Sequence, residues 1–255
     1  MSRQPPEQQA PPVQRLRIRY AKRGRLRFTS HRDFSRAFER AVFRARIPMA
    51  YSSGFNPHPR ISYAGAAPTG SASEAEYLEI ALAQVVEPAD VHAQLAEALP
   101  DGLDVLEVID AATLRRPQPS GQAAVPSLAD LLQASRWTIG PLAGVSAADA
   151  EAAVTRFLAE ESVLVERMTK KGLREFDARA AVLDLGVRDT PGHADDAVSL
   201  ELVLRHTVPA VRPDDVLGGL ARLTGLDPGP SPLLTRLQQG PLDEATGEVG
   251  DPFAR

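Results

Sequence analysis

The feature that most constrains the fold is an order of expected strands and helices that occurs twice along the chain. Apolar residues with a period of two predict strands, and those with a period near 3.6 predict helices. In the first half, this predicts strands at 15–28 (a hairpin or one bulged strand), 61–63, 76–83 and 104–109, and helices from Ser30 to about Pro48 and at 88–99. In the second half, it predicts strands at 137–139, 198–205 and 233–237, strand material at 163–168 and 176–185 that is split at Lys170-Lys171-Gly172 and counts as one strand unit, and helices at 147–158 and 211–223. The order β-α-β-β-α-β in each half predicts an α+β protein with two tandem ferredoxin-like (split β-α-β) domains that contain antiparallel sheets.

The composition places the boundaries of these two domains. Residues 114–126 are rich in Pro, Gly, Ser and Gln and lack periodicity, which is typical of a linker. We therefore expect a disordered arm at 1–14, domains at 15–113 and 127–240 around this linker, and a flexible tail at 241–255. No stretch approaches the roughly 18 apolar residues of a membrane span, and the polar N-terminus lacks the apolar core of a secretion signal. These features predict a cytoplasmic protein with no membrane partner.

The chain has no cysteine. This excludes disulfides, thiol catalysis and Cys-ligated metal or iron–sulfur sites. Only five histidines are present, and none shows a recognised ligand spacing. We therefore expect neither a metal nor another cofactor.

Charge is strongly segregated along the sequence. Residues 15–60 hold thirteen Lys and Arg but only two acids, Asp33 and Glu39, so this block has a formal charge of +11 within a chain of −4. Binding follows local potential rather than net charge, so this block is where a polyanion would bind.

The periodicity of each element predicts how these basic residues are displayed. On the expected strands, arginines from Arg15 to Arg27 share one face, which in a split β-α-β domain is the face that the helices leave open. The helix carries four arginines at intervals of four residues. We expect phosphate contacts from Arg17, Arg19, Lys22, Arg25, Arg27, Arg32, Arg36, Arg40, Arg44 and Arg60. The alternative for any of these groups is a solvated charged face. Tyr20 and Phe28 are expected to point inward, so the open face would lack an aromatic platform and would bind backbone phosphates rather than bases.

A second motif, Ser53-Gly54-Phe55-Asn56-Pro57-His58-Pro59, predicts a rigid recognition loop. Each proline restricts the residue before it to extended conformations, so Asn56 and His58 would be held in fixed directions. His31 and His58 are also candidates for an acid/base pair, with Glu74 or Glu76 as carboxylate partners. The structural alternative is that His31 serves the start of a helix and His58 closes a turn.

The same residues resemble a known family. Tyr20-Ala-Lys-Arg-Gly-Arg-Leu-Arg-Phe-Thr-Ser-His-Arg-Asp-Phe, Tyr51-Ser-Ser-Gly-Phe-Asn-Pro-His-Pro-Arg and Ser73-Glu-Ala-Glu-Tyr-Leu are similar to segments of the radical-SAM-linked protein family, a bacterial domain of unknown function. Its members are fused to B12-binding radical SAM proteins or stand alone. The resemblance implies cooperation with a radical SAM protein and, by gene neighbourhood, with a ribonuclease E/G-type enzyme. It assigns no activity to any residue.

These observations lead to three hypotheses of different classes. The favoured one is a non-catalytic accessory module of a radical SAM enzyme that binds RNA, either tRNA or rRNA, through its basic N-terminal domain. The chain cannot itself be the radical SAM enzyme, which needs three cysteines for its cluster. One alternative is an enzyme that acts on RNA or a phosphorylated metabolite through His31 and His58. The other is a protein-docking adaptor for a radical SAM partner.

Overall fold

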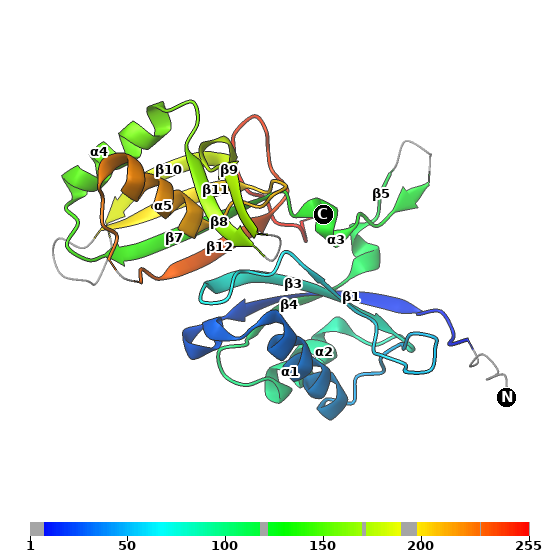
Figure 1. Cartoon of the computed structure of the whole chain (residues 1–255). Helices are drawn as coiled ribbons and strands as arrows, with labels where there is room; N and C mark the ends of the chain where they lie inside the picture. The colour runs from blue at the N-terminus through cyan, green and yellow to red at the C-terminus, as the bar shows by residue number, and fades with distance from the viewer. Residues whose placement is uncertain (1–7, 118–121, 170–171, 190–197, 230, 255) are drawn as a thin grey trace. The chain divides into compact units, whose positions relative to one another are not determined.

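The computed structural model describes residues 8–117, 122–169, 172–189, 198–229 and 231–254 (Figure 1). The chain folds into two units, one formed by Met1–Leu131 with Phe253–Arg255 and the other by Leu132–Pro252. Strands and helices occur in both units, which confirms the α+β class. No helix in the described ranges is both long and apolar enough to span a membrane.

Unit 1 contains one antiparallel sheet with two helices on the same side (Figure 1). Its main elements are β1 (Gln14–Lys22), α1 (His31–Arg44), β2 (Ile61–Ala64), β3 (Ala72–Leu82), α2 (Pro88–Ala98) and β4 (Val105–Asp110). Each strand is antiparallel to its neighbours in the order β2-β3-β1-β4.

The alternation of β1 explains why the helices cover only one face of this sheet. Leu16, Ile18 and Tyr20 are buried in the same core as residues of α1 and α2. The Tyr20 ring stacks on Phe34 of α1 with 4.5 Å between ring centroids. The arginines of β1 occupy the alternate positions, so they belong to the opposite face of the sheet.

Residues 24–28 differ from the prediction, which extended the strand pattern to Phe28. They form a 3-10 helix, η1 (Gly24–Phe28), directly after β1. Gly24 has φ of +53°, and the backbone N–H of Leu26 donates to the carbonyl of Arg23. This left-handed conformation ends the strand, so the alternating Arg25-Leu26-Arg27-Phe28 pattern does not lie in the sheet.

Unit 2 has a second antiparallel sheet, in the strand order β10-β11-β7-β12. Its elements are β7 (Ala134–Leu142), α4 (Ala147–Ala159), β8 (Leu164–Thr169), β9 (Gly172–Asp177), β10 (Val182–Asp189), β11 (Val198–Arg205), α5 (Pro213–Thr224) and β12 (Leu234–Gly240). Strands β8 and β9 pair with each other as a separate hairpin. The prediction of one strand at 176–185 is wrong, because η3 (Arg179–Ala181) separates β9 from β10.

The segments expected to be linker and tail contain ordered contacts. After η2 (Ala111–Leu114), β5 (Arg116–Pro117) pairs with β6 (Ala123–Ala124), and α3 (Leu128–Leu131) follows. Beyond β12, Leu242 and Val249 form a β-bridge. The buried ring of Phe253 packs edge-on against Tyr77 at 5.3 Å between centroids.

We expect Gly240→Ala to lower the free energy of unfolding of unit 2 by about 1–3 kcal/mol. A Cβ atom at Gly240 would lie 2.0 Å from the carbonyl oxygen of Gly250, so the backbone after β12 must move to admit it. Urea denaturation followed by fluorescence of Trp137, the only tryptophan and a buried residue of β7, measures this effect. Gly186→Ala on β10 is the control, because no heavy atom lies within 4 Å of its added Cβ. Equal losses in the two variants would contradict the prediction.

Candidate nucleic-acid interface

Helix α1 has one face toward the core and a second face toward solvent. At its start, the Ser30 hydroxyl accepts a hydrogen bond from the backbone N–H of Asp33 at 3.2 Å, which caps the helix. Phe34, Phe38 and Val42 are buried against the sheet. Because these residues recur at intervals of four, another set with the same spacing can line the solvent-facing side.

That set is a row of four exposed arginines, which we call the α1 basic stripe. Its members are Arg32, Arg36, Arg40 and Arg44. Among the residues that the structure describes, their side chains form one hydrogen bond, which Nη1 of Arg44 donates to the carbonyl of Ala98 at 3.2 Å. In the described part of the chain, none of the four forms an ion pair with a carboxylate. Within these ranges, the stripe therefore presents cationic groups that form no salt bridge with an intramolecular acid.

An exposed aromatic residue lies within the stripe. The side chain of Phe43 is 82% exposed, and Arg36, Glu39, Arg40, Phe43 and Arg44 together line one hollow on α1. Phe28 on η1 is 59% exposed, so the expectation that it points inward is wrong. Tyr20, by contrast, is buried as predicted. Cationic side chains beside an exposed aromatic ring can contact phosphates and stack on a base.

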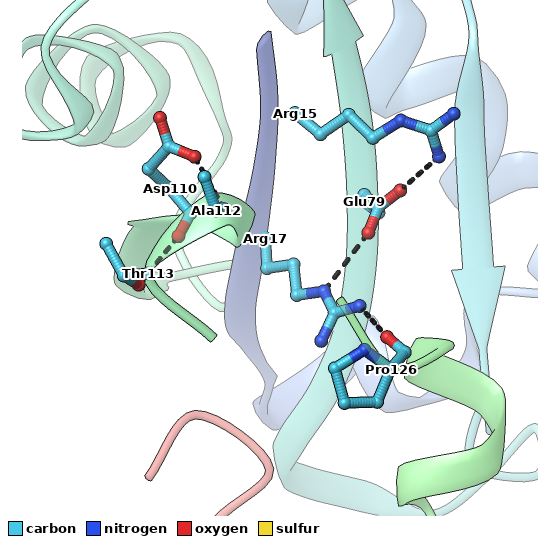
Figure 2. Close-up of polar contacts among 7 residues, drawn as sticks. All are labelled: Arg15, Arg17, Glu79, Asp110, Ala112, Thr113 and Pro126. Carbon is cyan, nitrogen blue, oxygen red and sulfur yellow. Dashed lines mark hydrogen bonds and ion pairs between the residues drawn. The ribbon is translucent and has the colours of Figure 1, made fainter. Parts of the chain in front are cut away.

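The arginines of β1 are paired instead. Nη1 of Arg15 and Nε of Arg17 donate to the two carboxylate oxygens of Glu79 at 2.9 and 3.0 Å (Figure 2). Arg19 lies 3.6 Å from Glu107. The pairing register explains this arrangement, because Glu79 on β3 is opposite Arg17 and Glu107 on β4 is opposite Arg19. We therefore correct the prediction that this face displays free arginines. Carboxylates on the neighbouring strands pair with these arginines and relieve the repulsion among them.

The other predicted phosphate contacts have different environments. Lys22 is buried, and its Nζ donates to the carbonyls of Ala67 and Pro68 at 3.4 Å. Arg25 on η1 is exposed, and the guanidinium of Arg27 lies 4.5 Å from the centre of the Phe28 ring. Arg60 is exposed, with Nε donating to the carbonyl of Tyr51 at 3.2 Å. Lys22 is thus the member of this group least accessible to a ligand.

The predicted recognition loop projects from the pair Tyr51 and Pro59, which form a β-bridge. The Ser52 hydroxyl accepts a hydrogen bond from the backbone N–H of His58 at 3.0 Å, and Gly54 has φ of +131°. Phe55 at the tip is 64% exposed. The flanking residues Ser53, Asn56 and Pro57 are exposed as well, whereas Gly54 and Pro59 are partly buried. The loop is therefore closed by its own hydrogen bonds and displays side chains to solvent.

No contact joins the candidate acid/base residues within the described ranges. His31 packs edge-on against Tyr63 at 4.9 Å between centroids, and burial raises the pKa of Tyr63 to about 12. His58 lies on the exposed loop. These same ranges contain no group of three or more His, Asp or Glu side chains that could hold a metal ion.

The carboxylate candidates have structural partners. Glu74 forms an ion pair with Arg23, and this hydrogen bond is the main cause of the raised pKa of Arg23. Glu76 is buried, and its carboxylate accepts the backbone N–H of Ala67 at 3.2 Å. Neither carboxylate has a contact with His31 or His58 in the part of the chain that the structure describes.

Sequence reasoning missed Glu79, Glu107 and Phe43. Both glutamates lie on strands that pair with β1, and the signal that could have indicated Glu79 is an acid within the apolar run of β3. Phe43 follows Val42 of the buried stripe, but its own helical position faces solvent. The available signal for an exposed ring was therefore an apolar residue of this helix that lies outside its buried stripe.

Comparisons with known proteins give a family. No curated protein matches the sequence. Among solved structures, an unknown protein from Galdieria sulphuraria aligns at 13% identity over 82% of this chain and 91% of that chain. The TM-score of this alignment is 0.23, so the likeness supports no conclusion about fold or function. Residues 15–213 match the family described as uncharacterized protein conserved in bacteria (DUF2344), and this range covers most of both units. The chain therefore belongs to this family of uncharacterized bacterial proteins.

Proposed function

We propose that this chain is a non-catalytic accessory module that binds RNA, either tRNA or rRNA, for a radical SAM enzyme. In this proposal both units are ferredoxin-like domains. The β-α-β-β-α-β order of unit 1 and the matching strand orders of the two sheets support that assignment. The interface is the α1 basic stripe together with Phe43, rather than the arginines of β1.

The observation that supports RNA most strongly is the unpaired stripe around an exposed ring. A guanidinium binds phosphate through a rigid fork of donors and also stacks on bases. Phe43 adds a flat apolar surface on which an unpaired base can stack. A purely structural stripe of arginines would be expected to have acidic partners, as Arg15, Arg17 and Arg19 do.

The radical SAM partner rests on the sequence resemblance over about residues 15–83 and on the absence of cysteine. A chain without cysteine cannot ligate the cluster itself, so it would act on the substrate side by binding the RNA. The acid/base alternative gains no support from the geometry, because no contact in the described ranges links His31 to His58.

The affinity for single-stranded RNA is expected to fall steeply with salt. If the four arginines of the α1 basic stripe each contact one phosphate, the slope of log K against log salt concentration is about −3, because each contact releases roughly 0.7 counterion. Fluorescence anisotropy with a labelled oligoribonucleotide at a series of salt concentrations measures the slope. A slope near zero would reject phosphate binding. Retention of a radical SAM protein by the chain after nuclease treatment, without RNA affinity, would favour the docking alternative.

A further inference from the structure

The face of the unit 1 sheet opposite α1 and α2 contains a cavity of about 670 Å³. Strands β1, β2 and β3 form its floor, and residues around η2 and α3 contribute the rest of its lining. Its volume falls within the range of pockets that hold small organic molecules. The lining includes apolar side chains, among them Val13, Val85 and Leu128.

The acidic and the basic side chains of this cavity differ in how fully they are hydrogen-bonded. Both oxygens of Glu79 accept from arginines, one from Arg15 and the other from Arg17. Both oxygens of Asp110 also accept hydrogen bonds at 2.8 Å, one from Nε2 of Gln14 and the other from the backbone N–H of Ala112. Figure 2 shows the bond from Ala112. The acids of the cavity therefore have no carboxylate oxygen without a hydrogen bond.

The cationic side of the cavity retains donors. Arg17 is only 1% exposed; its Nε donates to Glu79 and its Nη2 to the carbonyl of Pro126, whereas Nη1 has no hydrogen-bond partner in the described residues. A buried donor without an acceptor is costly, so a ligand that supplies an acceptor would be favoured. Arg115 also lines the cavity and forms no ion pair with a described carboxylate. Three arginines against two acids give the lining a formal charge of +1.

We propose that this cavity binds a small organic molecule with an apolar body and one oxyanion group, whose oxygen accepts a hydrogen bond from Nη1 of Arg17. The excess positive charge favours an anion, and the apolar lining favours a carbon skeleton rather than an inorganic ion. A carboxylate and a phosphate share this chemistry. This site does not depend on RNA binding, because the α1 basic stripe lies on the opposite side of the core.

Titration calorimetry with 2-naphthoate, 1-naphthyl phosphate and the uncharged 2-naphthamide tests the proposal. We expect at least one anion to bind with a roughly millimolar or lower Kd and at least about tenfold more tightly than the amide. The stronger anion identifies the oxyanion type. Absence of binding by both anions, or equal affinities of the anions and the amide, would overturn the proposal.

Two variants and one control locate the binding site. Ala112→Trp fills the cavity from an exposed lining position without removing a charge, so it should abolish anion binding. The control is Ala89→Trp, at an exposed position of α2 outside the lining, which should leave anion binding unchanged. Arg17→Lys keeps the charge but removes the guanidinium fork, and it should weaken anion binding about tenfold. If Arg17→Lys does not fold, the result for Ala112→Trp alone tests whether the anion binds in this cavity. Unchanged affinity in Ala112→Trp overturns the assignment.

Discussion

Glu79→Ala is expected to lower the free energy of unfolding of unit 1 by about 3–5 kcal/mol. In the described ranges, Glu79 is the one carboxylate that pairs with Arg17, a residue that is 1% exposed, and the two groups are 3.0 Å apart. Removal of the acid leaves a buried positive charge whose remaining hydrogen-bond acceptor among the described residues is the carbonyl of Pro126. Desolvation of that charge is then no longer offset by an opposite charge. Urea denaturation followed by circular dichroism, with hydrogen exchange of the β3 amides to locate the effect, measures the loss.

Two comparisons separate this cost from a general loss of packing. Arg15→Ala removes the other partner of Glu79, but the Arg15 side chain is 60% exposed, so the expected cost is at most about 1 kcal/mol. The pair Arg17→Met with Glu79→Leu removes both charges together and should recover most of the stability lost in Glu79→Ala. A loss below about 1 kcal/mol in Glu79→Ala would show that the charge of Arg17 does not require Glu79.

Local pattern predicted the elements whose apolar residues are the ones that the fold buries. The strand at 198–205 has the predicted bounds, because its apolar residues are buried in the sheet of unit 2. The helix opened by Pro88 also begins as predicted, since proline is favoured in the first turn. The features that determine such segments lie within the segments themselves, so a single sequence is enough to predict them.

The failures have one local and one long-range cause. The pattern of Arg25 to Phe28 alternates like a strand, but the left-handed Gly24 turns the chain out of the sheet. The arginines of β1 were expected to be free because their acidic partners are more than sixty residues away in sequence. Only the pairing register of β1 with β3 brings Glu79 to Arg17. Sequence could therefore identify the basic block, but not which of its arginines remain available for a ligand.

The same distinction predicts which arginines RNA binding requires. The double variant Arg36→Glu/Arg40→Glu should reduce RNA affinity on the order of a hundredfold at low salt, because two phosphate contacts are lost and two repulsions are added. The slope of log K against log salt should become less negative by about 1.4. Both positions are exposed, so the fold should be retained, and circular dichroism verifies this. Fluorescence anisotropy with the labelled oligoribonucleotide measures affinity and slope.

Matched controls distinguish the α1 basic stripe from net charge alone. Arg156→Glu/Arg222→Glu makes the same charge change at exposed positions on α4 and α5 of unit 2 and should have a much smaller effect on affinity. Phe43→Ala removes the exposed ring without changing charge, so it should weaken binding by about 1–3 kcal/mol while leaving the salt slope unchanged. If both double variants lose affinity equally, the interaction follows total charge, and α1 is not the RNA interface. A slope that changes in Arg36→Glu/Arg40→Glu but not in Arg156→Glu/Arg222→Glu, together with a loss of affinity in Phe43→Ala, would instead place phosphate and base contacts on the same helix.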